Sequence, residues 1–291
     1  MTCDNQLEVK LERLKKIILD YGQMLTALSG GVDSVFLLVF ASRVYEESFG
    51  IGFGSENMSA LTASGPHFAP DEVEYAAYLC DCLGVSHKII KVDDILPLIE
   101  DNPADRCYIC KKAIFSQLKE RADMVGSVLT DGTNLDDMDD YRPGHQALQE
   151  LGVKSPLRDA GLTKSDIRCA LKQLASEDSS LAAALTLNNG MPVWQKPAFA
   201  CLASRIPYGE KITSAKLDSI YHAEVFLREL GFTQVRVRHH GDVARIEVLP
   251  EDRQRFCSSE LMDKVNDKIK ECGFRYAALD LGGYRMGNLN R

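Results

Sequence analysis

The hexapeptide Ser-Gly-Gly-Val-Asp-Ser at residues 29–34 constrains the fold of this chain more than any other feature. A short apolar run at residues 24–28 precedes it, and a longer apolar run at residues 35–41 follows it. The first run is typical of a strand, and the second is long enough for a buried helix. Because Gly30 and Gly31 lack a Cβ, their backbone can adopt a positive φ and approach an anion closely. The segment therefore predicts a strand, a phosphate-binding turn and a helix.

The side chains of the turn favour the same interpretation. Ser29 and Ser34 supply hydroxyl donors, and Asp33 supplies a carboxylate. The lysine of a Walker A loop is missing, so an ordinary P-loop NTPase is not expected. A plain glycine-rich turn is the alternative. Glycines alone would favour it, but the two serines, the aspartate and the flanking apolar runs favour an anion site.

Composition limits the class of protein. The 291 residues are enough for two domains, and 45% apolar with 26% charged residues is ordinary for a globular chain. The net charge of -8 argues against a dedicated nucleic-acid binder. No apolar run approaches the ~20 residues that span a bilayer, and the N-terminus does not resemble a signal peptide. We expect a cytoplasmic protein without a membrane or nucleic-acid partner.

Strand and helix patterns alternate through the first two thirds of the chain. The predicted elements include helices at 71–83 and 108–122 and strands at 88–92 and 127–130. This alternation predicts a parallel α/β sheet with helices on both faces, in a domain of residues 1–195. Ser29 and Asp131 would then follow the carboxyl ends of strands, where such sheets bind ligands.

The remaining residues, 196–291, predict a smaller α+β domain. A helix is expected at 214–230, a hairpin around Gly241-Asp242, a helix at 251–271 and a strand at 276–281. Between the two parts, residues 176–190 have the composition of a surface insertion.

Three of the nine cysteines form a pattern with chemical meaning. Cys107 and Cys110 form a CxxC, and Cys201 lies 94 residues after Cys107. A closed zinc site needs four ligands, and no second CxxC or HxxxH is present, so it is weakly supported. Three thiolates suit a [4Fe-4S] cluster with one exchangeable position. The alternative is that the cysteines only pack at the start of a helix and bind no cofactor.

Arginines on the hairpin form a second candidate site. Arg236 and Arg238 are two residues apart on one strand, so both side chains leave the same face. Two guanidiniums can bind a phosphate or carboxylates in bidentate fashion. A solvated basic face is the usual alternative for such a pattern, and Arg285 near the end of the chain is equally ambiguous.

The motifs together resemble a known family. SGGVDS is similar to the pyrophosphate-binding loop of N-type ATP pyrophosphatases, which have an adenine-nucleotide α-hydrolase-like (PP-loop) domain. The segments NPADRCYICK, DGTNLDD with YRPG, KPAFACLASRIPYG, RVRHHGDVARIEV and LDLGGYRMG follow in this order. The whole set resembles the LarE-type ATP-dependent sulfur transferases of nickel-pincer nucleotide biosynthesis, from the first loop nearly to the last residue.

The resemblance implies an activity and a set of residues. Family members adenylate a carboxylate of a pyridinium-3,5-dicarboxylate mononucleotide, and a sulfur nucleophile then displaces AMP to leave a thiocarboxylate. ATP with Mg²⁺ would bind at Ser29, Gly30, Gly31, Asp33, Ser34 and Asp131. The substrate phosphate would bind at Ser204, Arg205, Arg236, Arg238 and Arg285. Asp33 and Cys201 are the catalytic residues that it implies.

The resemblance leaves the source of the sulfur open. In some family members a cysteine at the position of Cys201 gives up its sulfur and becomes dehydroalanine. In members with the CxxC, three cysteines hold a [4Fe-4S] cluster whose extra sulfide is the donor, and Cys107, Cys110 and Cys201 favour that route here. The family also implies a homo-oligomer and an upstream sulfur donor as partners.

Three other functions fit the residues less well than this interpretation. A PP-loop tRNA thiolation enzyme should carry a recognisable RNA-binding appendage, and the acidic charge also counts against it. An amide-forming ligase should carry a glutaminase domain or an ammonia channel. A non-enzymatic redox or metal-binding module would leave the SGGVDS loop unexplained.

Overall fold

The computed structural model describes residues 3–50, 57–138, 143–197 and 200–285. Parts of the family motifs at 141–142, 198–199 and 286–287 lie outside these residues. The chain groups into two compact units, which are described separately. The first unit comprises residues 1–64, 70–95 and 107–198, and the second comprises 65–69, 96–106 and 199–291.

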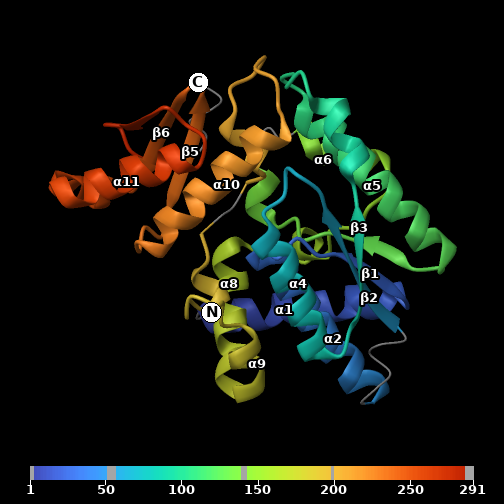
Figure 1. Ribbon diagram of the computed structural model, residues 1–291. Coiled ribbons are helices and arrows are strands. Elements are labelled where there is room, and N and C mark those ends of the chain that lie inside the picture. The colour runs from blue at the N-terminus through green and yellow to red at the C-terminus, as the bar shows by residue number, and fades with distance from the viewer. Residues whose placement is uncertain (1–2, 51–56, 139–142, 198–199, 286–291) are drawn as a thin grey trace. The chain divides into compact units, whose positions relative to one another are not determined.

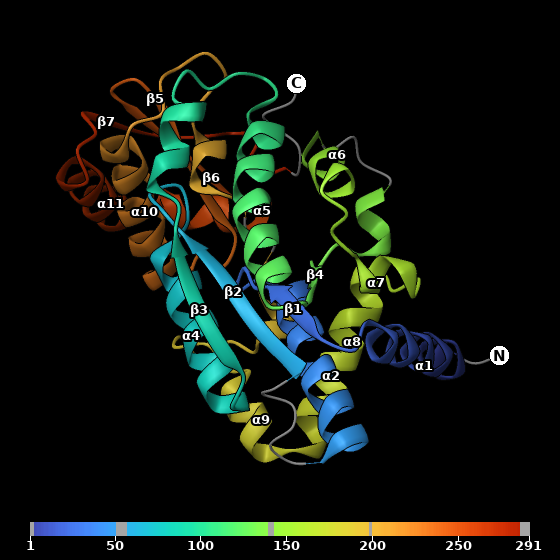
Figure 2. The ribbon, with the colours of Figure 1, turned by 90° about the vertical axis from the view of Figure 1, so that its right-hand side faces the viewer.

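The first unit is built on a four-stranded parallel sheet of order β3-β2-β1-β4 (Figure 2). Its strands are β1 (Met24–Ala27), β2 (Met58–Ser64), β3 (Ser86–Lys91) and β4 (Val128–Thr130). Thr26 of β1 pairs with Ala60 of β2 on one side and with Thr130 of β4 on the other. The prediction of a parallel α/β sheet is confirmed. The strand order reverses at β1, so the carboxyl ends of the paired strands β1 and β4 mark the topological switch point, where such sheets bind ligands.

Helices cover both faces of this sheet, as predicted. Figure 1 shows α4 on one side of the strands and α5 on the other. The helices are α1 (Cys3–Tyr21), α2 (Val32–Phe49), α4 (Pro70–Leu83), α5 (Arg106–Met124), α6 (Pro143–Glu150), α7 (Pro156–Asp159), α8 (Lys164–Glu177) and α9 (Ser179–Ala184). A short 3₁₀ turn follows at Val193–Gln195.

Helix α2 is the centre of the core, because residues 35–39 of this helix are fully buried. This middle part of α2 is apolar on all sides, as is typical of an internal helix, whereas its last turn is exposed. The helix packs against β1 and β2 and contacts α1, α4 and α8. The carboxyl end of β1 leads into its first turn, so the rigid core fixes the position of the loop between them.

The prediction that residues 176–190 form a surface insertion is wrong in one respect. Leu181, Ala184 and Leu185 belong to the buried core, and the Tyr75 hydroxyl donates to the carbonyl of Ala184 at 3.2 Å. The segment forms α9, which packs on α4 and α8. Its polar ends resembled a loop, but Asp178 caps α9 by accepting from the N–H groups of Ser180 and Leu181.

The second unit is built on a three-stranded sheet of order β5-β6-β7. Its elements are the 3₁₀ turn Leu202–Arg205, α10 (Ser214–Glu229), β5 (Val235–His240), β6 (Val243–Val248), the 3₁₀ segment Pro250–Cys257, α11 (Ser259–Glu271) and β7 (Tyr276–Leu279). β5 and β6 form the predicted hairpin, with Gly241 at φ 57°, and β7 adds parallel to β6. The single helix expected at 251–271 is instead interrupted at Ser258, whose side chain caps α11.

The second unit also contains residues 65–69 and 96–106, which the sequence boundary at 195/196 placed in the first domain. The contacts of Asn102 explain why the longer segment, 96–106, belongs to the second unit. The buried side chain of Asn102 donates to the carbonyls of Ile206 and Pro207, at 3.2 and 2.6 Å, and Arg106 donates to its oxygen. Tyr208 packs under the Arg106 guanidinium at 4.7 Å.

Candidate functional site

The glycine-rich loop lies at the carboxyl end of β1, as predicted, and opens directly into α2. The hydroxyls of Ser29 and Ser34 are 3.0 Å apart, and the Ser29 N–H donates to the Ser34 hydroxyl at 3.2 Å. Ser34 is buried, and its hydroxyl donates to the carbonyl of Gly31 at 3.1 Å. These contacts close the loop into a small ring of hydrogen bonds at the N-terminus of α2, and a helix N-terminus is the usual place for a phosphate.

Gly30 meets a geometric requirement that no other residue could meet. Its φ is +74°, and a Cβ built on it would lie 2.6 Å from the carbonyl oxygen of Glu72. Gly31 differs from the expectation, since its φ is -77° and it is the N-cap residue of α2. The loop is therefore pressed against the first turn of α4 at Gly30 and starts the helix at Gly31.

Asp33 lies in the first turn of α2, and its environment is unusual for a carboxylate. Its Oδ1 is buried and has no hydrogen-bond partner among the described residues. Burial raises the pKa of this carboxyl, and the ammonium of Lys164, 3.6 Å from Oδ2, opposes that change. A buried, unpartnered carboxylate oxygen at an anion-binding loop fits a hard cation such as Mg²⁺, which takes oxygen ligands.

Asp131 follows β4 and lies beside the loop, as predicted, but its oxygens are engaged. The hydroxyl of Ser155 donates to Oδ1 at 2.6 Å, and that of Thr133 donates to Oδ2. The adjacent Gly132 packs on α2, because a Cβ there would lie 2.7 Å from the backbone nitrogen of Ser34. Asp131 is thus tied to Thr133 and Ser155, and the segment that it begins packs against the first turn of α2 at Gly132.

Sequence reasoning missed three charged residues around the loop. Lys164 is the partner of Asp33, and Glu72 and Lys196 form an ion pair of 2.6 Å beside Gly30. Lys164 directly follows Thr163, which caps α8 in a capping box with Asp166, so the pattern Thr-Lys-Ser-Asp was a local signal for the helix start that carries Lys164. Glu72 and Lys196 are 124 residues apart and had no local signal.

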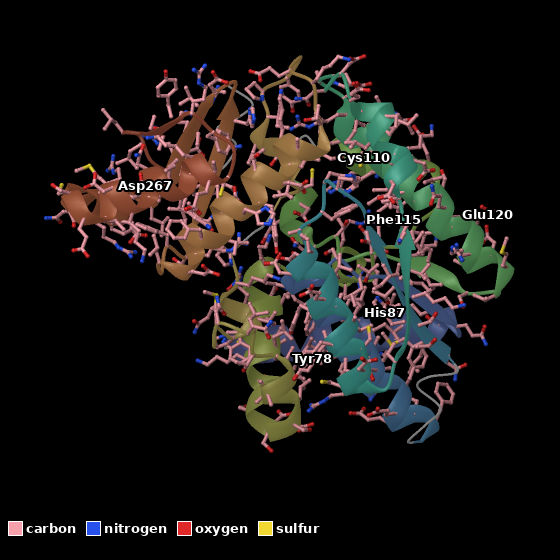
Figure 3. All side chains as sticks on the ribbon, viewed as in Figure 1. Tyr78, His87, Cys110, Phe115, Glu120 and Asp267 are labelled. Carbon is pink, nitrogen blue, oxygen red and sulfur yellow. The ribbon has the colours of Figure 1, made fainter. Side chains whose placement is uncertain are left out.

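The two cysteines of the CxxC lie in the first two turns of α5, where Figure 3 labels Cys110. Cys107 is exposed and Cys110 is half-buried. Residues three apart share one face of a helix, so the two thiols can serve one ligand. Soft thiolates suit an iron–sulfur cluster. In the described parts of either unit, no three His, Cys, Asp or Glu side chains are grouped so that they could hold a metal ion.

In the second unit, Cys201 is the N-cap residue of the turn that carries Ser204 and Arg205. The Arg205 side chain is fully buried, and its guanidinium donates to both carboxylate oxygens of Glu224, at 2.9 and 3.0 Å. It also donates to the carbonyls of Ala200 and Cys201 and to the Ser204 hydroxyl. Arg205 thus fixes the backbone around Cys201, whereas the resemblance implies that it binds the substrate phosphate.

The two hairpin arginines share a face, as predicted, but the solvated alternative is wrong because each is only 6% exposed. Arg238 donates twice to Glu247, at 3.1 and 3.0 Å, and once to the carbonyl of Ser204 at 2.8 Å. Arg236 has its guanidinium 5.3 Å from the Tyr284 ring centre. Burial and the charge of Arg205 lower the pKa of Arg236 to about 10, so it stays protonated at neutral pH.

Arg285 is exposed at the end of the described chain. The structure therefore separates the five predicted substrate residues by environment. Arg205 and Arg238 are bound to buried carboxylates, and Ser204 lies between them. Arg236 is buried beside Tyr284 and donates to the carbonyl of Val235, whereas Arg285 is exposed.

The glycine-rich loop lies at the switch point of a parallel sheet, and the buried Oδ1 of Asp33 lies in the helix turn that follows it. Together these features define a PP-loop domain of the N-type ATP pyrophosphatases. In agreement, the asparagine synthase family model matches residues 21–116. No helix in the described part of the chain is long and apolar enough to cross a membrane.

Relatives that match nearly the whole chain identify the family within this superfamily. The pyridinium-3,5-bisthiocarboxylic acid mononucleotide synthase of Lactiplantibacillus plantarum is 35% identical over 288 residues, covering 98% of this chain and 95% of that protein. An uncharacterised protein of Synechocystis sp. is 38% identical over 98% of both chains. An uncharacterised protein of Methanocaldococcus jannaschii is 29% identical over 97% of this chain and 95% of its own length. The chain belongs to the family of LarE-type ATP-dependent sulfur transferases.

Proposed function

We propose that this protein converts a carboxylate of pyridinium-3,5-dicarboxylate mononucleotide into a thiocarboxylate at the expense of ATP. The observation that carries the proposal is the whole-chain match to a pyridinium-3,5-bisthiocarboxylic acid mononucleotide synthase. The phosphate-binding loop and the buried Asp33 oxygen at the sheet's switch point support the ATP-dependent half. The product is a step toward a nickel-pincer nucleotide.

The reaction divides into two balanced steps. The substrate carboxylate attacks the α-phosphate of ATP, which forms an acyl-adenylate and releases pyrophosphate. A sulfur nucleophile then attacks the acyl carbon, and the C–O bond to AMP breaks. When the nucleophile is hydrosulfide, the products are the thiocarboxylate, AMP and one proton.

The first unit supplies the groups for adenylation. Ser29, Ser34 and the N–H groups at Gly31 and beyond bind the departing pyrophosphate. Asp33 would hold Mg²⁺, and the bound ion would supply positive charge to offset the charge of the leaving pyrophosphate. Gly30 provides the close approach of the backbone, and Asp131 keeps the neighbouring strand end in place.

The second unit supplies the groups for the mononucleotide. Arg236, with Arg285 and Ser204, binds the substrate phosphate. Arg205 and Arg238 hold the backbone of the turn that presents Cys201. This division follows from their contacts, because both of those guanidiniums already bind a buried glutamate.

For the sulfur we propose a [4Fe-4S] cluster held by Cys107, Cys110 and Cys201. This part rests on the sequence, since Cys201 belongs to a different unit from the other two. When bound, the cluster would supply sulfide at its fourth, non-cysteine position. The alternative is that the Cys201 thiolate attacks the acyl carbon, which expels AMP and leaves a thioester. Loss of the α-proton of Cys201 would then cleave its Cβ–S bond, which releases the thiocarboxylate and leaves dehydroalanine.

Product analysis tests the first part. Wild-type protein with the mononucleotide, ATP and Mg²⁺ should form AMP and pyrophosphate, and ADP as the product would refute adenylation. Anaerobic purification with iron and sulfide analysis tests the second. Iron should be lost in Cys107→Ser and Cys110→Ser alike. Protein without iron that has lost the elements of H₂S at Cys201 would establish the sacrificial route instead.

A further inference from the structure

The ammonium of Lys196 lies against the backbone of the glycine-rich loop. Its Nζ donates to the carbonyl of Gly30 at 2.9 Å and to Oε2 of Glu72 at 2.6 Å. Both side chains of this pair are only 13% exposed, and the Tyr75 ring lies 5.4 Å from Nζ. We call Glu72, Lys196 and the Gly30 carbonyl the loop clamp.

The backbone of Lys196 is itself fixed. The Arg168 guanidinium donates to the carbonyl of Lys196 at 2.7 Å and also to the carbonyl of Trp194. On the other side, Glu72 lies in the first turn of α4, whose backbone touches Gly30. The clamp therefore joins two rigid anchors, α8 through Arg168 and α4 through Glu72, to one carbonyl of the loop.

A trans peptide points its C=O and its N–H in opposite directions. Lys196 binds the oxygen of the peptide between Gly30 and Gly31, so the N–H of that peptide, which belongs to Gly31, points away from the lysine. It points into the loop, where it donates to the Ser29 hydroxyl at 3.3 Å. That hydroxyl is one of the donors at which an anion would bind.

Glycines on both sides of this peptide make it easy to rotate, since neither carries a Cβ that would restrict it. A rotated peptide would turn its carbonyl oxygen toward the anion and replace attraction by repulsion. Holding the oxygen with a cation removes that alternative. The cation is in turn neutralised by Glu72, so the clamp adds orientation without leaving a net charge beside the loop.

We propose that Lys196 and Glu72 are positioning residues that orient the Gly30–Gly31 peptide for binding the pyrophosphate part of ATP. The inference rests on the proposed use of ATP at this loop. Lys196 acts through the peptide and not by touching phosphate, because its Nζ is already engaged by Glu72 and the Gly30 carbonyl.

The test uses Lys196→Met and Glu72→Ala, separately and together, in the full chain. Binding of Mg·ATP, pyrophosphate and AMP is measured by calorimetry. Both single variants should weaken Mg·ATP and pyrophosphate by about 10- to 100-fold, the worth of one charge-assisted hydrogen bond. AMP should bind with nearly unchanged affinity, and the double variant should be no weaker than Lys196→Met, because the pair acts as one unit.

A matched control is available in the same unit. Lys15 and Glu47 form an ion pair of 2.7 Å, and Glu47 lies near the C-terminal end of α2, away from the loop. Lys15→Met should leave all three affinities unchanged. Lys196→Arg keeps a cationic donor and should recover part of the loss.

Glu72→Ala decides between positioning and direct contact. If Lys196 bound phosphate itself, freeing it from Glu72 would leave the affinity for pyrophosphate unchanged or raise it, and the proposal would be overturned. Equal weakening of AMP would also overturn it. Hydrogen exchange of residues 29–36 without nucleotide gives a readout independent of ATP chemistry. It should accelerate in both variants, and unchanged exchange refutes the clamp even if the proposed function fails.

Discussion

Replacing Arg205 by methionine should destabilise the second unit strongly, because it removes the cation that neutralises a buried carboxylate. Both side chains of the Arg205–Glu224 pair are fully buried and are joined by two contacts, of 2.9 and 3.0 Å. Breaking such a pair from one side costs about 3–5 kcal/mol. For a unit of this size the melting temperature should fall by roughly 10–30 °C.

The double variant Arg205→Met/Glu224→Gln isolates the cause. It removes the orphaned charge, while the amide oxygen of the introduced glutamine can still accept from the Val237 N–H, which donates to Glu224 at 3.0 Å in the wild type. We expect it to recover most of the lost stability, since a neutral replacement of a buried pair is often nearly neutral in free energy.

Acid should reduce the difference between Arg205→Met and the wild type. Burial opposes ionisation of Glu224, but the Arg205 guanidinium, aided by the charge of Arg236 and the Val237 N–H, holds its pKa below the ordinary value. A depressed native pKa contributes stability above the unfolded pKa, and this contribution is lost as pH falls through the native pKa. In the variant Glu224 becomes protonated more readily, although Arg228 at 3.8 Å still favours its charge. The gap in stability should therefore be widest near neutral pH.

The assay separates the two units. Hydrogen exchange of peptides from α10 and β5 reports on the second unit, whereas fluorescence of Trp194, the single tryptophan, reports on the first. Exchange should accelerate in Arg205→Met while the fluorescence transition stays in place. A variant that keeps wild-type exchange and melting but loses affinity for the mononucleotide would refute the structural role. Arg205 would then be a substrate ligand.

Three further predictions concern the two candidate sites. Asp33→Asn should lower the rate of AMP formation at a fixed Mg²⁺ concentration by about two powers of ten, the loss of one charge-assisted contact, and should raise the Mg²⁺ concentration needed for the half-maximal rate; an unchanged Mg²⁺ dependence would contradict a role as metal ligand. Gly132→Ala should weaken Mg·ATP by at least about 10-fold without changing charge, because its Cβ would lie 2.7 Å from the first turn of α2; normal affinity by calorimetry would contradict this. Arg236→Ala should raise the KM for the mononucleotide by about 10- to 100-fold and leave that for ATP unchanged, with partial rescue by lysine, which lacks the planar fork; equal losses in steady-state assays would place Arg236 at the nucleotide.

The nucleotide loop was predictable because its signals are local. Two apolar runs around SGGVDS were enough to predict β1, the turn and α2, and the neighbouring position of Asp131 followed from the parallel sheet. Gly30 has the expected positive φ, whereas Gly31 does not. The sequence indicates that the turn needs glycine. It does not indicate which of the two glycines packs against the backbone of Glu72, and in the structure this is Gly30.

The charged residues that hold the loop were not predictable in the same way. Lys196 and Glu72 meet only because α4 and the segment after α9 pack on the same core. Each residue alone looks like an ordinary surface charge, and no periodicity connects them. A contact between side chains so far apart in the chain is set by tertiary packing, on which local propensity carries no information.

The arginines of the hairpin are an intermediate case, because their partner was within reach of the sequence. A two-residue turn at Gly241-Asp242 fixes the register, so that Arg236 faces Glu247 and Arg238 faces Arg245. Glu247 then lies on the same face as both arginines, and the structure pairs it with Arg238 and Arg245. Arg236 itself donates to the carbonyl of Val235 at 2.8 Å and lies beside the ring of Tyr284, and it is the arginine of this strand that our proposal assigns to the substrate phosphate.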